Sequence, residues 1–170
     1  MSDTVRLDEL RRRIEKDPAS IAFAQLAEEC RRLGRHEDAV EICHNGLARH
    51  PGYLSARVTL GRALLHLGRL DEAEQELENV LRGAPQNLAA LRALGDIHHR
   101  RGDLPQALSN YQAASLLAPN DPELERAVSE LSEALARSAS EREYLRARSV
   151  VAALEQWLAA VHVTRAQRSA

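Results

Sequence analysis

Apolar and small residues recur along the chain in three blocks, each 34 residues after the one before. The recurring positions are a leucine, an alanine and a proline: Leu26, Leu60 and Leu94; Ala39, Ala73 and Ala107; Pro51, Pro85 and Pro119. A small residue follows each leucine, namely Ala27, Gly61 and Gly95. Self-similarity at a period of about 20–50 residues is typical of repeat architectures. The sequence therefore predicts three copies of one structural unit over residues 20–121.

Each copy predicts an antiparallel pair of helices. The leucine and its small neighbour lie midway along a first helix, and the alanine lies early on a second helix, where it meets the small residue. The glycines Gly34, Gly68 and Gly102 follow the first helices, where a left-handed residue is favoured. The prolines end the second helices. Such a pair leaves one apolar face uncovered, and stacking of neighbouring pairs buries it. The three units are expected at 20–53, 54–87 and 88–121.

The flanking segments predict helices that cover the ends of the stack. In residues 1–19, Val5 or Leu7 shares one helical face with Leu10 and Ile14. Residues 122–139 begin with proline at a first helical position and match only the first half of a fourth unit. Four apolar residues can cover the third unit: Leu124, Val128, Leu131 and Leu135. Both segments are therefore predicted to be capping helices.

A separate amphipathic helix with a frayed tail is predicted over residues 140–170. Ser140 and Glu143 form a capping-box sequence at its start. Its apolar stripe can cap the stack, pair with a second copy, or bind another protein. We expect residues 140–153 to complete the stack and residues 154–163 to pack against a second copy, giving a homodimer. The interface residues are Val151, Leu154, Trp157, Leu158 and Val161.

The three copies resemble the tetratricopeptide repeat, whose pattern is W-x2-L-G-x2-Y, then A-x3-F, then P. The corresponding residues are Phe23, Leu26, Ala27, Cys30, Ala39, Cys43 and Pro51; Arg57, Leu60, Gly61, Leu64, Ala73, Leu77 and Pro85; and Leu91, Leu94, Gly95, His98, Ala107, Tyr111 and Pro119. Large aromatics are mostly replaced, whereas the small residues and the spacing are kept. The resemblance implies an all-α, right-handed α-solenoid of about three helix hairpins with flanking capping helices. It also implies a non-enzymatic adaptor or scaffold for protein binding. The alternative is a self-assembling structural protein that homodimerises through its C-terminal helix.

Bulk composition narrows the classes of function. A net charge of −2 argues against a nucleic-acid binder. No run approaches the roughly 18 apolar residues of a membrane span, and the N-terminus does not resemble a signal peptide. A cytoplasmic location is therefore expected, with Cys30 and Cys43 as reduced, buried thiols; a disulfide or a redox pair stays open. Lys16 is the only lysine among 23 basic residues, which suggests GC-rich codon usage and a bacterial source.

Motifs for catalysis, cofactors or metals are not found in the sequence. The phosphate-binding glycine motifs G-x-x-x-x-G-K-[ST] and G-x-G-x-x-G are both absent. The two cysteines form no C-x-x-C pair, and no serine lies in a G-x-S-x-G motif. The seven histidines form no H-E-x-x-H motif. The prediction is a protein that is not an enzyme, with no cofactor and no metal.

The resemblance also implies where a partner binds, because first helices of tetratricopeptide repeats line an inner groove. The predicted groove residues are Glu28, Arg31, Arg62, Leu65, His66, Arg92, Asp96, His99 and Arg100. Arginines outnumber acids among the groove positions, which suits an acidic protein or peptide ligand; the alternative is that arginine is simply abundant in this chain. The positions that form a Lys/Asn carboxylate clamp in chaperone-binding members carry other residues here: Ala24, Glu28, Thr59, Ala89 and Ala93. A co-chaperone of that type is therefore not expected.

Overall fold

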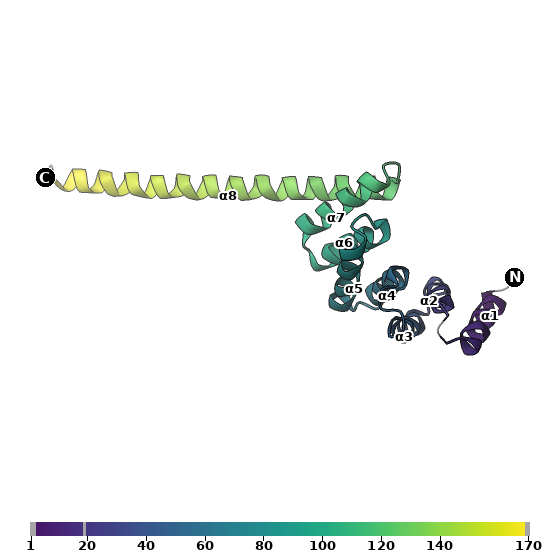
Figure 1. Cartoon of the computed structure of the whole chain (residues 1–170). Coiled ribbons are helices and arrows are strands. Elements are labelled where there is room, and N and C mark those ends of the chain that lie inside the picture. Colours follow the sequence, from purple (N-terminus) through teal and green to yellow (C-terminus); the bar gives the residue numbers. More distant parts are fainter. Residues whose placement is uncertain (1–2, 19, 169–170) are drawn as a thin grey trace. The chain divides into compact units, whose positions relative to one another are not determined.

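The structure is a computed structural model that describes the backbone of residues 3–18 and 20–168 and the side chains of residues 5–18 and 20–157. Every regular element within these residues is an α-helix (Figure 1). The helices are α1 (Asp3–Lys16), α2 (Ala22–Arg32), α3 (His36–Leu47), α4 (Leu54–His66), α5 (Leu70–Gly83), α6 (Leu88–Arg101), α7 (Leu104–Leu117) and α8 (Pro122–Arg168). The chain divides into two compact units, Met1–Val128 and Ser129–Ala170, and the division falls within α8.

The first unit is a stack of three helix hairpins. Helices α2 and α3, α4 and α5, and α6 and α7 pair with one another. The first helices also pack in the series α2, α4, α6, and each of α3 and α5 contacts the first helix of the next hairpin. Helix α1 packs on α2. The predicted all-α solenoid of three hairpins is confirmed.

Glycine ends the first helix of each hairpin, as the sequence predicts. Gly34, Gly68 and Gly102 have φ values of 75°, 75° and 79°. Residues with a Cβ atom rarely adopt this left-handed conformation, whereas glycine does so without steric cost. The chain can therefore reverse direction within a few residues at the same point of each repeat.

Close packing inside the second and third hairpins depends on a glycine in the first helix. A Cβ atom at Gly61 would lie 2.6 Å from Cγ of Leu77, and one at Gly95 would lie 2.5 Å from Cε1 of Tyr111. The sequence predicted that Ala73 and Ala107 would meet these glycines. The atoms nearest to the two glycines belong to Leu77 and Tyr111, one turn later on the second helix, because these longer side chains reach across the hairpin.

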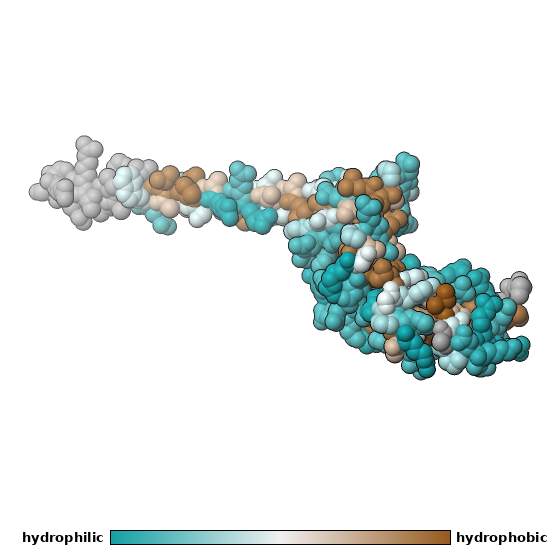
Figure 2. Space-filling view, viewed as in Figure 1, coloured by the Kyte–Doolittle hydropathy of each residue, from teal (hydrophilic) through white to brown (hydrophobic). Residues whose placement is uncertain are grey.

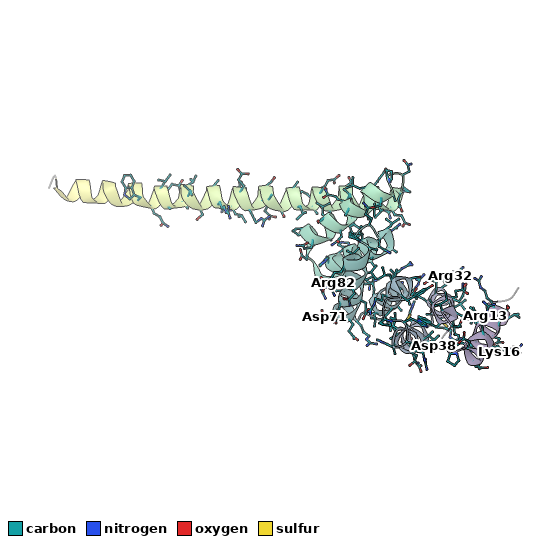
Figure 3. All side chains as sticks on the ribbon, viewed as in Figure 1. Arg13, Lys16, Arg32, Asp38, Asp71 and Arg82 are labelled. Carbon is teal, nitrogen blue, oxygen red and sulfur yellow. The ribbon has the colours of Figure 1, made fainter. Side chains whose placement is uncertain are left out.

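Small and aliphatic residues fill the interior of the repeat unit. Leu60, Leu64 and Ile97 are fully buried, and the two cysteines are free and buried among such residues. Burial raises the pKa of Cys43 to about 12, so its thiol stays protonated and behaves as a small apolar group. Charged side chains lie around the outside of the hairpins; examples are Arg32, Asp71 and Arg82 (Figure 3).

Helix α1 covers the first hairpin with two leucines. Leu7 and Leu10 are buried, Ile14 packs at the edge of the core, and Val5 is half exposed. Of the two alternatives at the start of this face, Leu7 is therefore the buried one. Arg6 adds an ion pair to Glu29 of α2, with 3.0 Å between its Nη2 and Oε1.

Helix α8 begins at a capped terminus and runs on without interruption to Arg168. Oδ1 of Asp121 accepts hydrogen bonds from the backbone N–H groups of Glu123 at 3.0 Å and Leu124 at 3.3 Å. The predicted helix start at Ser140 is wrong, because α8 runs through this residue; the packing of residues 140–153 on the stack stays a prediction. The physical reason for the continuous helix is that residues 123–140 contain neither glycine nor proline, so nothing ends the helix before Ser140.

Candidate functional site: a pocket between α4 and α6

A pocket of about 530 Å³ lies between the first helices of the second and third hairpins. Its lining consists of Arg62, Leu65, His66, Leu88, Ala89, Arg92, Ala93, Asp96 and Arg100. Six of these nine are among the predicted groove residues, because the register of the repeat brings corresponding positions of α4 and α6 to one face. Leu88 was missed by the sequence analysis, although its place at the start of the third repeat could have identified it.

The predicted groove residues on α2 do not reach this pocket and bind each other instead. Arg31 donates two hydrogen bonds to Glu28, from Nε to Oε2 at 2.9 Å and from Nη2 to Oε1 at 2.7 Å. The hydroxyl of Thr59 on α4 donates a third to Oε2 of Glu28, at 3.1 Å. The hydrogen bond from Arg31 is the largest cause of the lowered pKa of Glu28. This carboxylate is therefore ionised and already occupied.

Arg92 lines the pocket, but its guanidinium is engaged by two carboxylates. Its Nη1 lies 2.6 Å from Oδ2 of Asp121, and its Nη2 lies 2.7 Å from Oε2 of Glu123. These pairs connect α6 to the loop before α8 and to the first turn of α8. The charge that Arg92 offers to a ligand is consequently compensated within the repeat unit.

Arg100 also has a partner, but a neutral one. Its Nη1 donates a hydrogen bond to the backbone carbonyl of Leu65 at 2.8 Å. The carbonyl lies near the C-terminus of α4, where cationic side chains are favoured. The bond orients the guanidinium, which lines the pocket, without cancelling its formal charge.

Arg62 differs from both, because its guanidinium makes no hydrogen bond or ion pair with any residue whose side chain the structure describes. It is half-buried on α4 and faces the pocket. Burial is the largest cause of its lowered pKa, and the charges of Arg31 and Arg92 lower it further while Glu28 and Asp96 oppose them. Arginine still keeps its proton at neutral pH. The pocket therefore holds a cation whose five N–H donors have no protein acceptor.

Asp96 supplies the pocket with a fixed negative charge. The hydroxyl of Tyr111 donates a hydrogen bond to its Oδ1 at 2.6 Å. Burial, followed by this contact with Asp96, raises the pKa of Tyr111. The tyrosine ring lies against Gly95, so the same side chain closes the third hairpin and orients a carboxylate of the pocket.

Two histidines lie at the edge of the site. The rings of His36 and His66 are stacked, with centroids 4.5 Å apart and an angle of 4° between their planes. Burial lowers the pKa of His66, and His36 and three arginines add to the effect. His66 is therefore neutral at pH 7. The remaining predicted residue, His99, is exposed and does not line the pocket.

Two other kinds of site were sought among the described residues. No group of three or more histidine, cysteine, aspartate and glutamate side chains comes together in a way that could hold a metal ion. No helix in the same part of the chain combines the length and the apolar character that crossing a membrane requires.

The second unit carries exposed apolar side chains along α8. Val151, Leu154 and Trp157, three of the predicted interface residues, have 53%, 55% and 61% of their surfaces exposed. The side chains of Leu158 and Val161, the other two, lie outside the described residues. Figure 2 shows brown apolar patches alternating with teal polar ones along this helix. Val151, Leu154 and Trp157 therefore form an exposed apolar stripe within the second unit.

Stacked helix hairpins with a pocket between first helices define a helical-repeat solenoid. Two tetratricopeptide repeat profiles match residues 31–82 and 58–122, and together they cover more than half of the chain. The chain belongs to the tetratricopeptide repeat family. Members of this family are in general protein interaction modules.

The curated relatives are much longer than this chain. FK506-binding protein-like from Rattus norvegicus is 38% identical over 79 residues, which are 46% of this chain and 21% of the relative. Phagocyte signaling-impaired protein from Drosophila pseudoobscura pseudoobscura is 30% identical over 92 residues, 54% of this chain and 10% of the relative. The chain spans about a fifth or less of the length of these two proteins.

Solved structures of low sequence identity share the fold. MamA from Desulfovibrio magneticus RS-1 superposes with a TM-score of 0.72 at 21% identity, over 82% of this chain and 81% of that one. The first tetratricopeptide domain of Spaghetti (RPAP3), bound to the HSP90 peptide SRMEEVD, gives a TM-score of 0.65 at 18% identity, over 70% of this chain and 94% of that one.

Proposed function

We propose that this protein is a non-enzymatic scaffold that binds a segment of another protein in the groove formed by α2, α4 and α6. The observation that carries the proposal is the pocket between α4 and α6, where the guanidinium of Arg62 has no protein acceptor. Ligand sites are typically concave and mostly apolar, with a few polar groups that orient the ligand. Leu65, Leu88, Ala89 and Ala93 give this pocket its apolar part.

The proposed partner is an acidic segment. Arg62 and Arg100 bring two positive charges to the pocket that no carboxylate neutralises, against one negative charge from Asp96. The RPAP3 domain shows that a peptide with acidic residues binds this fold. The clamp positions of this chain carry Ala24, Glu28, Thr59, Ala89 and Ala93, so we propose a ligand other than the carboxyl terminus of a chaperone.

Selection from a random peptide library on the immobilised full chain tests this function. We expect the selected peptides to be enriched in acidic residues, and Arg62→Glu to abolish their binding. Arg49→Glu is the matched control, because Arg49 is exposed just after the end of α3, does not line the pocket, and its guanidinium bonds to the carbonyl of Asn45. Peptides that bind Arg62→Glu as well as the wild-type protein would contradict a ligand site in this groove.

For location and source, we propose the cytoplasm of a bacterium. Two free, buried cysteines suit a reducing compartment. The single lysine among the basic residues suits a GC-rich genome. Fractionation of the source organism followed by immunoblotting tests the location.

A second candidate function is self-assembly, in which two copies pair through α8 to form a homodimer. The observation that favours it is the exposed stripe of Val151, Leu154 and Trp157. Sedimentation of the intact chain at tens of micromolar should show a dimer that Trp157→Glu dissociates. Gln156→Glu is the matched control, because it adds the same charge at the neighbouring exposed position. A monomer for the wild-type chain would rule out the dimer.

A further inference from the structure

The groove consists of two halves that differ in how their charges are satisfied. Between α2 and α4, Glu28 accepts hydrogen bonds from Arg31 and Thr59, so both charges of this half are used within the protein. Between α4 and α6, Arg62 has no protein acceptor among the described side chains. A ligand can therefore form a new charge-assisted hydrogen bond in the second half without breaking an existing one.

The three arginines of the second half are not equivalent. Arg92 is held by two carboxylates at 2.6 and 2.7 Å, and a ligand would have to displace them. Arg100 is held by a backbone carbonyl at 2.8 Å. Arg62 alone among these three needs no exchange of partners. Arg62 is therefore the arginine at which an anionic group of a ligand gains the most binding free energy.

From this geometry we infer that Arg62 anchors one aspartate or glutamate side chain of the bound segment, and that an apolar residue beside it packs on Leu65, Leu88 and Ala89. The inference rests on the proposed function and assigns the chemistry of its ligand. A planar guanidinium matches a carboxylate through two parallel hydrogen bonds. Half-burial strengthens such a pair relative to one at the surface.

The charge of the pocket selects a carboxylate over a phosphate. Arg62 and Arg100 contribute two uncompensated positive charges, and Asp96 contributes one negative charge that Tyr111 holds in place. One carboxylate brings the sum to zero. A phosphoryl group carries about −1.5 to −2 at pH 7, which would leave an excess of negative charge beside Asp96.

Nuclear magnetic resonance of the full, ¹⁵N-labelled chain can follow the Nε–Hε group of Arg62 directly. The probes are three synthetic peptides: acetyl-Gly-Leu-Glu-Leu-Gly-amide, its Gln analogue, and acetyl-Gly-Leu-Leu with a free carboxyl terminus. Arg62→Gln assigns the resonance by removing it. We expect the Glu peptide to shift this resonance in a saturable way, with the Gln analogue binding at least about tenfold more weakly.

Variants separate a specific anchor from general attraction between charges. Arg62→Gln should make the Glu and Gln peptides bind equally, as judged from backbone signals of Leu65 and Ala89. Arg49→Gln removes the same charge at an exposed position and should leave the preference intact. Retention of the preference in Arg62→Gln would overturn the inference.

The remaining outcomes distinguish this inference from the function on which it rests. If the Glu and Gln peptides bind the groove equally well, the groove is a peptide site but Arg62 is not its anion anchor. If the peptide with the free terminus binds best, the carboxylate comes from a chain end, and the side-chain assignment is wrong. If no peptide shifts signals of α4 or α6, the groove function fails together with the inference.

Discussion

Replacing Gly61 with alanine tests the packing inside the second hairpin. A Cβ atom there would lie 2.6 Å from Cγ and 2.8 Å from Cδ2 of Leu77. Carbon atoms in ordinary contact are about 3.5–4.0 Å apart, so the leucine would have to move by about 1 Å. Leu77 is fully buried, and dense packing leaves it no open space to enter. The added methyl group should therefore strain the hairpin.

Two effects of opposite sign determine the net change in stability. Overpacking a core typically costs about 1–3 kcal/mol. Alanine in place of glycine within a helix contributes about 1 kcal/mol of stabilisation. We expect Gly61→Ala to lower the free energy of unfolding by up to about 2 kcal/mol, and Gly61→Leu to lower it further because more atoms must be accommodated.

The variant Leu77→Ala provides the matched background. Leu77→Ala by itself should lower the free energy of unfolding by about 2–5 kcal/mol. In that background Gly61→Ala should become stabilising by about 1 kcal/mol, because only the gain in helix propensity remains. Urea denaturation followed by circular dichroism gives the four free energies of the cycle. A coupling energy near zero between the two substitutions would refute the contact.

Three further predictions concern the hairpins and the edge of the groove. Ala73→Leu, at a fully buried position, should lower the free energy of unfolding by about 1–3 kcal/mol in urea; an unchanged midpoint would contradict the helix register. Thr59→Val should cost about 0.5–1.5 kcal/mol by thermal denaturation, since it removes a hydrogen bond to Glu28. The pKa of His66 lies below its ordinary 6.5 in the folded chain, so the unfolded chain binds the proton first and stability should fall as pH decreases through 6.5. His66→Gln should reduce that loss between pH 7.5 and 5.5, and an identical loss in both proteins would exclude His66 as its source.

The sequence predicts the stack of hairpins well, because each decisive feature is local and recurs with the repeat. Gly34, Gly68 and Gly102 have positive φ for a reason that can be read from their position after the first helices. The same register places Arg62 and Asp96 at corresponding positions of α4 and α6. Most of the residues that line the pocket could therefore be predicted from the sequence.

The repeat pattern could not predict which arginine of the pocket has a guanidinium without a protein partner. Arg92 is neutralised by Asp121 and Glu123, which lie 29 and 31 residues further along the chain. Arg100 is held by a backbone carbonyl that offers no sequence signal. Arg92 and Arg100 have partners because their side chains reach atoms on neighbouring elements, whereas the guanidinium of Arg62 reaches none among the described residues. A repeat pattern in the sequence does not determine which atoms a long side chain reaches.

The error in α8 has a similar origin. Ser140 and Glu143 suit a helix start, but the same residues are tolerated inside a helix. A local capping signal begins a new helix only if the preceding helix ends, and residues 123–140 contain no glycine or proline to end it. The structure therefore has one continuous helix where the sequence suggested two.

The most direct test of the central claim is the affinity of a library-selected acidic peptide for the intact chain, measured by fluorescence anisotropy with the wild-type protein and with Arg62→Glu. Reversing the charge removes the free cation of the pocket and places a carboxylate beside that of Asp96. The account predicts a loss of at least about 100-fold in affinity with unchanged helix content, because losing a charge-assisted hydrogen bond and adding repulsion together exceed about 2.7 kcal/mol. Equal affinity for both proteins would contradict the claim that this groove binds the partner.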